Sequence, residues 1–183
     1  ARTASSRASS KTMPSEHVLV TGGCGYIGSA LVPLLQDDDT VEAVTVLDSL
    51  SGGSPRNLLE ARLGEDVAFR RGDVREYGDV ESAMRGVDTV VHLAAITGAS
   101  STHDRREETF AVNRDGTTNV LTAAQKLGVD NVVFASSCNN YGRTTETDID
   151  ESTAMDPLNP YAETKVESEL DLREHVEAGD FDG

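Results

Sequence analysis

The chain has 183 residues, with 32 acidic and 16 basic side chains and a formal net charge of −16. This length suits one domain that can bury a core of its own. The negative charge argues against partners that present a phosphate backbone or an anionic membrane surface. We therefore expect neither nucleic acid nor a membrane as a partner.

The distribution of charge is typical of a halophile's protein. Lysine occurs only at positions 11, 126 and 165, and acids run together at residues 37–39. Salt would screen the self-repulsion of such a surface. A moderately acidic cytosolic protein is the alternative.

The cysteines and histidines indicate no metal site and no disulfide framework. Cys24 and Cys138 have no metal-ligand spacing, and the histidines are scattered. No apolar run approaches the roughly 20 residues that span a bilayer. We expect a cytoplasmic protein in a reducing compartment.

Residues 1–12 differ from the rest because they contain no acid and are rich in Ser, Ala and Arg. We predict a disordered tail there, ahead of a domain at residues 13–183. Met13 is an alternative natural start, and a short targeting peptide is a further interpretation.

From His17 onward, short β-branched runs alternate with longer amphipathic stretches, as in βαβ units. The predicted strands are 17–21, 43–47, 67–70, 89–93 and 131–135. The predicted helices are 26–36, 55–63, 77–84, 105–127 and 160–177. Most of the strands are continuously apolar, which indicates burial on both faces. The pattern predicts an α/β fold with a doubly wound, mostly parallel sheet, helices on both faces, and ligand sites at the carboxyl ends of the strands.

The segment TGGCGYIG places Gly22, Gly25 and Gly28 between the first predicted strand and the first predicted helix. In a dinucleotide fingerprint, such glycines allow the turn, the approach of backbone to pyrophosphate, and close helix packing. The amino end of the helix, at Tyr26 and Ile27, then offers N–H groups to phosphate. A simple turn before a helix would explain the glycines equally well if they stood alone.

Asp48 ends the second predicted strand, twenty residues after Gly28. A carboxylate at this spacing accepts hydrogen bonds from the adenosine ribose hydroxyls and repels a 2′-phosphate. No Arg follows directly in DSLSGGS, so NAD is favoured over NADP. The competing interpretation is a surface Asp at a strand end.

In YAETK, Tyr161 and Lys165 stand four residues apart and share one face of a predicted helix. An ammonium beside a phenol favours the phenolate, which is the form that a general base requires. By itself the spacing is more often that of two surface residues.

In this order, the motifs TGGCGYIG, DSLS, GDV, HLAA, AVN, SSCNNYG and YAETK resemble the extended short-chain dehydrogenase/reductase family. More narrowly, they resemble its NAD-dependent sugar-nucleotide epimerase/dehydratase group, represented by UDP-glucose 4-epimerase. The resemblance covers residues 17–177. It implies NAD as cofactor and a nucleotide sugar as substrate, in a Rossmann domain without the family's carboxyl-terminal substrate-binding part.

The resemblance also implies roles for individual residues. Asp73 and Val74 would contact the adenine, and Asn113 would be a buried polar residue of the following helix. Leu93, Ala94 and Ala95 would line the cofactor. Ser137 would be the catalytic hydroxyl, which donates a hydrogen bond to the reacting oxygen.

In the implied mechanism, Tyr161 removes a proton from a sugar hydroxyl while a hydride passes from that carbon to the nicotinamide. Lys165 keeps Tyr161 ionised and binds the nicotinamide ribose. Related dehydratases place Asp-Glu after the catalytic hydroxyl, whereas this chain has Cys138 and Asn139, so elimination is disfavoured. Asn140 also stands where an aliphatic residue is commoner.

Two further interpretations remain beside an active epimerase or oxidoreductase. The chain could be a non-catalytic, NAD-sensing Rossmann protein, although a sensor need not keep Ser137, Tyr161 and Lys165. It could instead be an inactive truncated fragment. The resemblance further implies a homodimer through the two long helices, predicted at residues 105–127 and 160–177.

Overall fold

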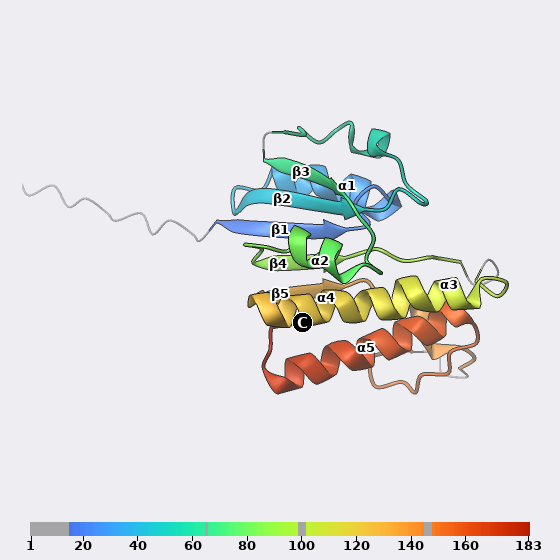
Figure 1. Ribbon diagram of the computed structural model, residues 1–183. Coiled ribbons are helices and arrows are strands. Elements are labelled where there is room, and N and C mark those ends of the chain that lie inside the picture. Colours follow the sequence, from blue (N-terminus) through green and yellow to red (C-terminus); the bar gives the residue numbers. More distant parts are fainter. Residues whose placement is uncertain (1–14, 65, 99–101, 145–147) are drawn as a thin grey trace, which may run out of the picture.

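The computed structural model describes residues 15–64, 66–98, 102–144 and 148–183, so the predicted tail at residues 1–12 lies outside the described residues. At its centre is a parallel five-stranded sheet with the order β3-β2-β1-β4-β5 (Figure 1). The strands are β1 (Glu16–Thr21), β2 (Val41–Asp48), β3 (Val67–Arg71), β4 (Thr89–His92) and β5 (Asn131–Phe134). The predicted Rossmann-type α/β fold is confirmed.

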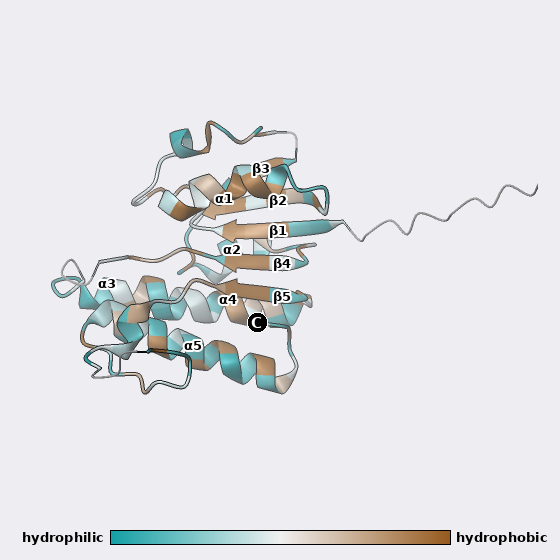
Figure 2. Ribbon diagram, turned by 180° about the vertical axis from the view of Figure 1, so that it is seen from behind, coloured by the Kyte–Doolittle hydropathy of each residue, from teal (hydrophilic) through white to brown (hydrophobic). Residues whose placement is uncertain are grey.

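Helices cover both faces of this sheet because consecutive strand residues point to opposite sides. Val18 and Val20 of β1 pack with α1 (Tyr26–Gln36) and η1 (Pro55–Leu58). Leu19, between them, packs with α2 (Tyr77–Ala83) and α4 (Gly116–Leu127). α5 (Pro160–Ala178) runs beside α4 (Figure 1). Toward their carboxyl ends, β1 and β4 are hydrophobic in Figure 2, in keeping with burial between two helical layers.

The prediction of a helix at residues 55–63 is wrong beyond the first turn, because only the short 3-10 helix η1 forms there. Leu63 makes a parallel bridge with Val67, and the N–H of Gly64 donates to the carbonyl of Val67 at 2.9 Å. Gly64 also has a φ of 90°. Backbone groups that a longer helix would use therefore form the turn that leads into β3.

The helix predicted at residues 105–127 is present but interrupted. It consists of α3 (Arg106–Phe110), a π-helical turn η2 (Ala111–Asp115), and α4. In the π turn, the carbonyl of Asn113 accepts hydrogen bonds from the hydroxyls of Thr117 and Ser168. Wide turns of this kind are frequent at functional sites.

The residues after α5 return along the outer edge of β5. Gly179 ends α5 in the left-handed conformation, with a φ of 78°. Asp182 then forms a parallel bridge with Asn131, and its carbonyl accepts from the N–H of Val132 at 2.8 Å. Val133 of β5 is 54% exposed, so the sheet face to which its side chain points is uncovered at this strand. In the described part of the chain, no helix combines the length and the apolar character needed to cross a bilayer.

The start of α1 packs directly onto the turn after β1. A Cβ atom on Gly28 would lie 2.4 Å from the Cα of Gly23, which is too close for two carbon atoms that are not bonded to each other. Gly78, in α2, is a useful contrast because a Cβ there would meet nothing within 4 Å.

Gly28→Ala should therefore destabilise the fold by about 1–3 kcal/mol, as overpacking does. Gly78→Ala should be neutral or stabilising by up to about 1 kcal/mol, because alanine is the better helix former. Urea unfolding of both variants measures the difference. Equal stabilities would show that α1 can move away from the turn at no cost.

Candidate cofactor-binding and active site

The carboxyl ends of all five strands lie at one edge of the sheet, because the strands are parallel (Figure 1). The glycine turn follows β1, and Asp48 ends β2. Asp73, Leu93 and Ser137 come after β3, β4 and β5. The chain reverses its winding direction between β1 and β4, which is where doubly wound sheets bind ligands. The fold thus brings the predicted motifs to one edge.

The glycine turn leaves the amino end of α1 open. Gly22 has a φ of 71°, which favours glycine, and Gly25 precedes the helix without any side-chain cap. The first N–H groups of α1 therefore lack partners within the helix and suit an anion. Tyr26 and Ile27 begin α1 with side chains that are 96% and 60% exposed, so they lie outside the core.

Asp48 is buried at the end of β2 and holds the glycine turn. Its Oδ2 accepts from the N–H of Cys24 at 2.9 Å, and its Oδ1 accepts from the N–H of Leu50 at 2.7 Å. Leu50 has a φ of 62°, a conformation that costs a side-chain-bearing residue about 1–2 kcal/mol. A carboxylate can accept about four hydrogen bonds, so Asp48 retains capacity for ligand hydroxyls.

Asp73 and Val74 lie in different surroundings. The guanidinium of Arg75 hydrogen-bonds the Asp73 carboxylate at 2.6 and 3.0 Å and holds the pKa of that carboxyl below its usual value. Val74 is buried in the core against Gly116. Adenine contact by these two residues stays a prediction, and the Val74 side chain is already occupied by packing.

Asn113 anchors the segment that follows β4. Its Oδ1 accepts from the N–H of Ile96 at 2.7 Å, and its Nδ2 donates to the carbonyl of Ile96 at 3.0 Å and to Thr164 Oγ1 at 3.2 Å. The side chain is buried, in the π turn. It therefore connects residues 93–96, which include Leu93, Ala94 and Ala95, to α5.

A buried chain of hydrogen bonds runs through His92, and its direction fixes the form of the imidazole. The Thr117 hydroxyl donates to the Asn113 carbonyl, so its oxygen accepts from His92 Nε2–H at 3.0 Å. Nδ1 is then unprotonated and accepts from the Thr21 hydroxyl at 2.6 Å. Thr21 Oγ1 in turn accepts from the N–H of Ala94 at 3.3 Å. All of these hydrogen bonds can form together only when the ring is neutral, because Nδ1 must accept from Thr21.

The interior keeps His92 neutral. Complete burial and, to a smaller extent, the nearby Lys165 together lower the pKa of His92 to about 3. The ring also stacks on Phe134, with centroids 5.9 Å apart. A protonated ring would donate from both nitrogens and leave the Thr21 hydroxyl without its acceptor.

Tyr161 and Lys165 lie in the first half of α5, whose start is capped by Asn159. Lys165 is 3% exposed, and its Nζ donates to the carbonyl of Ala135, just beyond β5, at 2.7 Å. Nζ also lies 4.4 Å from the ring centroid of Phe134 and 5.9 Å from that of Tyr161. Burial lowers the pKa of Lys165 to about 8, although Glu169 raises it. The predicted pair thus reaches the edge that carries the glycine turn and Asp48.

Ser137 precedes the short helix η3 (Cys138–Tyr141). Its Oγ accepts from the N–H and the Nδ2 of Asn139, at 3.3 and 3.1 Å. Both contacts use lone pairs of the hydroxyl, so its proton is free to be donated to a ligand.

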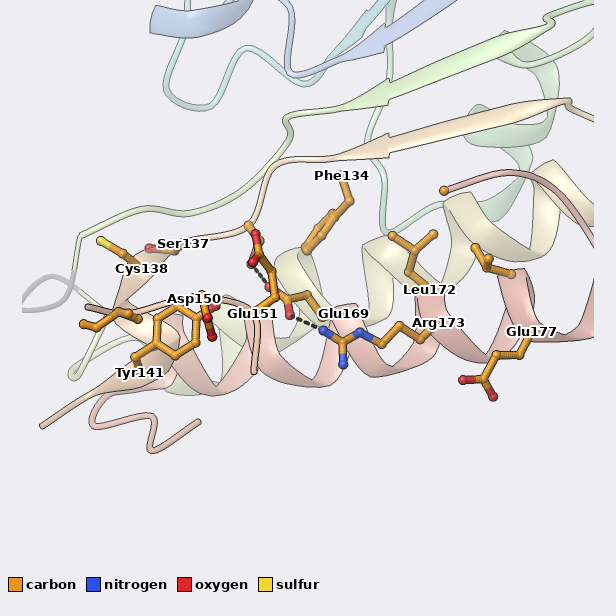
Figure 3. A pocket seen from close by; sticks show the side chains of 14 residues that line it. Phe134, Ser137, Cys138, Tyr141, Asp150, Glu151, Glu169, Leu172, Arg173 and Glu177 are labelled. Carbon is orange, nitrogen blue, oxygen red and sulfur yellow. Dashed lines mark hydrogen bonds and ion pairs between the residues drawn. The ribbon is translucent and has the colours of Figure 1, made fainter. Parts of the chain in front are cut away.

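A groove of about 700 Å³ lies between the segment after β5 and α5 (Figure 3). Ser137, Cys138 and Tyr141 line one end of it. Among the described residues, the groove has one basic lining residue, Arg173. Its acidic lining residues are Asp150, Glu151, Glu169 and Glu177. This charge disfavours phosphate in the groove, so the open end of α1 is the better phosphate site.

Asn57 and Glu169 were not identified from the sequence. Asn57 Nδ2 donates to the carbonyl of Cys24 at 2.8 Å and so supports the glycine turn from a distance of 33 residues in the chain. Nothing in the sequence signals that contact. Glu169 contacts Ser136, which precedes η3, and Asn140 within η3. It follows Lys165 by one helical turn, and this shared helix face was the signal that could have identified it.

These features define a dinucleotide-binding α/β protein. The profile of the NAD dependent epimerase/dehydratase family matches residues 18–183. The chain is 34% identical over 171 residues to UDP-glucose 4-epimerase 3 of Oryza sativa subsp. japonica, a match that covers 89% of this chain and 45% of that relative. The chain belongs to the NAD-dependent epimerase/dehydratase family.

Solved structures agree with this assignment. A dTDP-glucose 4,6-dehydratase from Streptomyces venezuelae, with NAD and TYD bound, has a TM-score of 0.85 and 33% identity over 90% of this chain and 53% of that one. UDP-glucose 4-epimerase from Brucella ovis in complex with NAD has a TM-score of 0.81 and 30% identity. The match covers 90% of this chain and 49% of that one. The chain thus spans about half the length of these relatives.

The comparisons support NAD as the cofactor, and the residues of this chain fit it. The open first turn of α1 suits a pyrophosphate, and Gly22 lies so close to Ala94 that a Cβ would be 2.7 Å from its nitrogen. Asp48 has acceptor capacity left at the end of β2.

The buried neutral His92 should make stability fall as the pH drops below 6.5. The unfolded chain binds a proton there, whereas the folded ring binds one only near pH 3. The loss should approach about 1.4 kcal/mol per pH unit between pH 6 and 4.5, above the range in which most carboxylates titrate. His92→Gln retains a donor and an acceptor without titrating, so its stability should be flatter there.

Urea unfolding across this pH range measures the effect. His103→Gln is the control, since His103 is exposed. Parallel pH profiles for the wild-type chain and His92→Gln would contradict a neutral His92 in the folded state.

Proposed function

We propose that this chain is the NAD-binding half of an epimerase or oxidoreductase that acts on a nucleotide sugar by transient hydride transfer. The observation that carries the proposal is the buried Lys165, whose bond to Ala135 brings α5 to the carboxyl edge of the sheet. Tyr161, Lys165 and Ser137 thereby stand at the same edge as the glycine turn and Asp48.

Different residues of the chain bind the cofactor and transfer the proton. The first turn of α1 binds the pyrophosphate, and Asp48 accepts hydrogen bonds from the adenosine ribose. NAD supplies the hydride acceptor when it is bound. Exposed Tyr26 and Ile27 lie where the dinucleotide would cover them, beside Gly25 and Gly28.

Tyr161 acts as the general base and Lys165 as the charge that favours its phenolate. Only one of the three Lys165 N–H donors is used by Ala135, which leaves donors for the nicotinamide ribose. Ser137 has its proton free for the reacting sugar oxygen. These roles support a reaction in which a sugar hydroxyl loses its proton while the carbon that bears this hydroxyl loses a hydride.

Elimination of water is the less favoured reaction. Cys138 and Asn139 follow Ser137, and neither side chain is a carboxylic acid. Asn139 is also committed to Ser137 through two hydrogen bonds. These residues support epimerisation or oxidation over dehydration.

We place this activity in the cytoplasm of a halophile, because of the charge of −16 and the scarcity of lysine. We also infer a homodimer through α4 and α5. Leu170 of α5 is 49% exposed and supports an apolar contact there.

Asp48→Ala should weaken NAD binding at least about tenfold, because the ribose loses a charged acceptor. Discrimination between NAD and NADP should narrow at the same time. Asp39→Ala removes the same charge from an exposed loop at the other end of β2 and should change neither affinity. Calorimetric titration of each protein with both dinucleotides measures these effects. The absence of NAD binding by the wild-type chain would contradict the proposed function.

Lys165→Met should weaken NAD binding about tenfold at pH 7, whereas Tyr161→Phe should leave it within about twofold. Wild-type affinity should decline as the pH rises through about 8, because the ammonium is then lost, and Lys165→Met should lack this decline. In a catalytically complete form of the protein, the reduced nicotinamide formed in a single-turnover assay with a nucleotide sugar should be absent with Tyr161→Phe. Retained reduction by that variant would remove Tyr161 from the mechanism.

A further inference from the structure

Glu169 joins α5 to the segment that follows β5. Its Oε1 accepts from Asn140 Nδ2 at 3.0 Å and from the hydroxyl of Ser136. Asn140 Nδ2 also donates to Ser136 Oγ at 3.0 Å, so the three side chains form a closed triangle. Figure 3 shows the Glu169 side chain at this junction, between α5 and the strand-end segment.

Lys165 and Glu169 hold the same segment from one face of α5. They are four residues apart and therefore neighbours on that face. Lys165 binds the carbonyl of Ala135, and Glu169 binds the side chain of Ser136. Ser137 follows these two anchored residues directly.

The opposite side of Ser137 is anchored as well. Asn140 is 1% exposed, and its backbone carbonyl accepts from the N–H of Asp156 at 2.9 Å. Its side chain reaches Glu169, so the η3 turn is tied to α5 on both sides of Ser137. The Ser137 hydroxyl itself bonds only to Asn139 among the described contacts.

An ordinary surface ion pair does not explain Glu169. Arg173 lies 3.8 Å from it and is 54% exposed, and such pairs contribute little stability. The two hydrogen bonds to Ser136 and Asn140 are the stronger contacts because their acceptor is charged and partly buried.

We propose that Glu169 is a positioning residue: its carboxylate fixes residues 135–140 against α5 and thereby holds Ser137 in place relative to Tyr161 and Lys165. The consequence for catalysis rests on the proposed function, whereas the attachment itself does not. The same carboxylate favours the charged form of Lys165. The other titratable groups beside Lys165 are Tyr161 on α5 and His92 on β4, which is neutral above pH 5.

Two variants separate geometry from charge. Glu169→Gln keeps an acceptor oxygen for Ser136 and Asn140 but removes the charge, whereas Glu169→Ala removes both. Glu167→Gln is the matched control, since Glu167 lies two residues away on α5 and pairs with Arg114 instead.

The first measurement is amide hydrogen exchange of residues 135–141 in the chain without ligand. Glu169→Ala should exchange about tenfold faster there. Glu169→Gln should exchange faster by a smaller factor, because its neutral amide oxygen is a weaker acceptor, and Glu167→Gln should match the wild type. Unchanged exchange in Glu169→Ala would overturn the attachment. If that variant does not fold, the titration below decides the proposal with Glu169→Gln alone.

The second measurement is the pH titration of Lys165 by NMR with carbon-labelled lysine, which is simple because the chain has only three lysines. The Lys165 signal is identified by its absence from Lys165→Met. Glu169→Gln should lower the Lys165 midpoint by about half a pH unit or more, and Glu167→Gln should not. An unchanged midpoint, or an equal shift in the control, would contradict the proposal. Failure of the wild-type chain to bind NAD would instead overturn the proposed function and leave the attachment intact.

Discussion

The hydrogen bond from the buried Lys165 ammonium to the carbonyl of Ala135 is the contact on which the arrangement of the site depends. It attaches α5 to the end of β5, although 30 residues separate the two partners in sequence. A lysine buried to this extent would be costly if its charge had no partner. The carbonyl of Ala135, the ring of Phe134 and the carboxylate of Glu169 provide the compensation.

A second set of buried polar contacts aligns the strand ends with the helices. The chain from Ala94 through Thr21, His92 and Thr117 to Asn113 has a single direction, because each hydroxyl has one proton to donate. Asn113 then holds Ile96 and Thr164. Polar groups in this interior therefore specify which backbone segments meet at the ligand edge, while the apolar residues supply the layers around the sheet.

The same edge is divided electrostatically. The amino end of α1 presents unpaired N–H groups, whereas the groove beside α5 is lined mainly by carboxylates. An anionic ligand would find attraction at the first place and repulsion at the second.

The sequence by itself determined the parallel sheet, the glycine turn, Asp48 at the end of β2 and the shared face of Tyr161 and Lys165. These features depend on local periodicity and short spacings, which the chain carries in any context. The prediction of a helix at 55–63 was wrong because Leu63 and Gly64 pair with Val67 at the start of β3. Helix propensity describes single residues and carries no information about such a pairing. Only the tertiary structure decided that the Val74 side chain is buried against Gly116, that Asn57 supports the glycine turn and that Glu169 meets Ser136 and Asn140. Each of these contacts joins residues far apart in the chain, and their distance is set by the packing of whole helices on the sheet rather than by the residues around them.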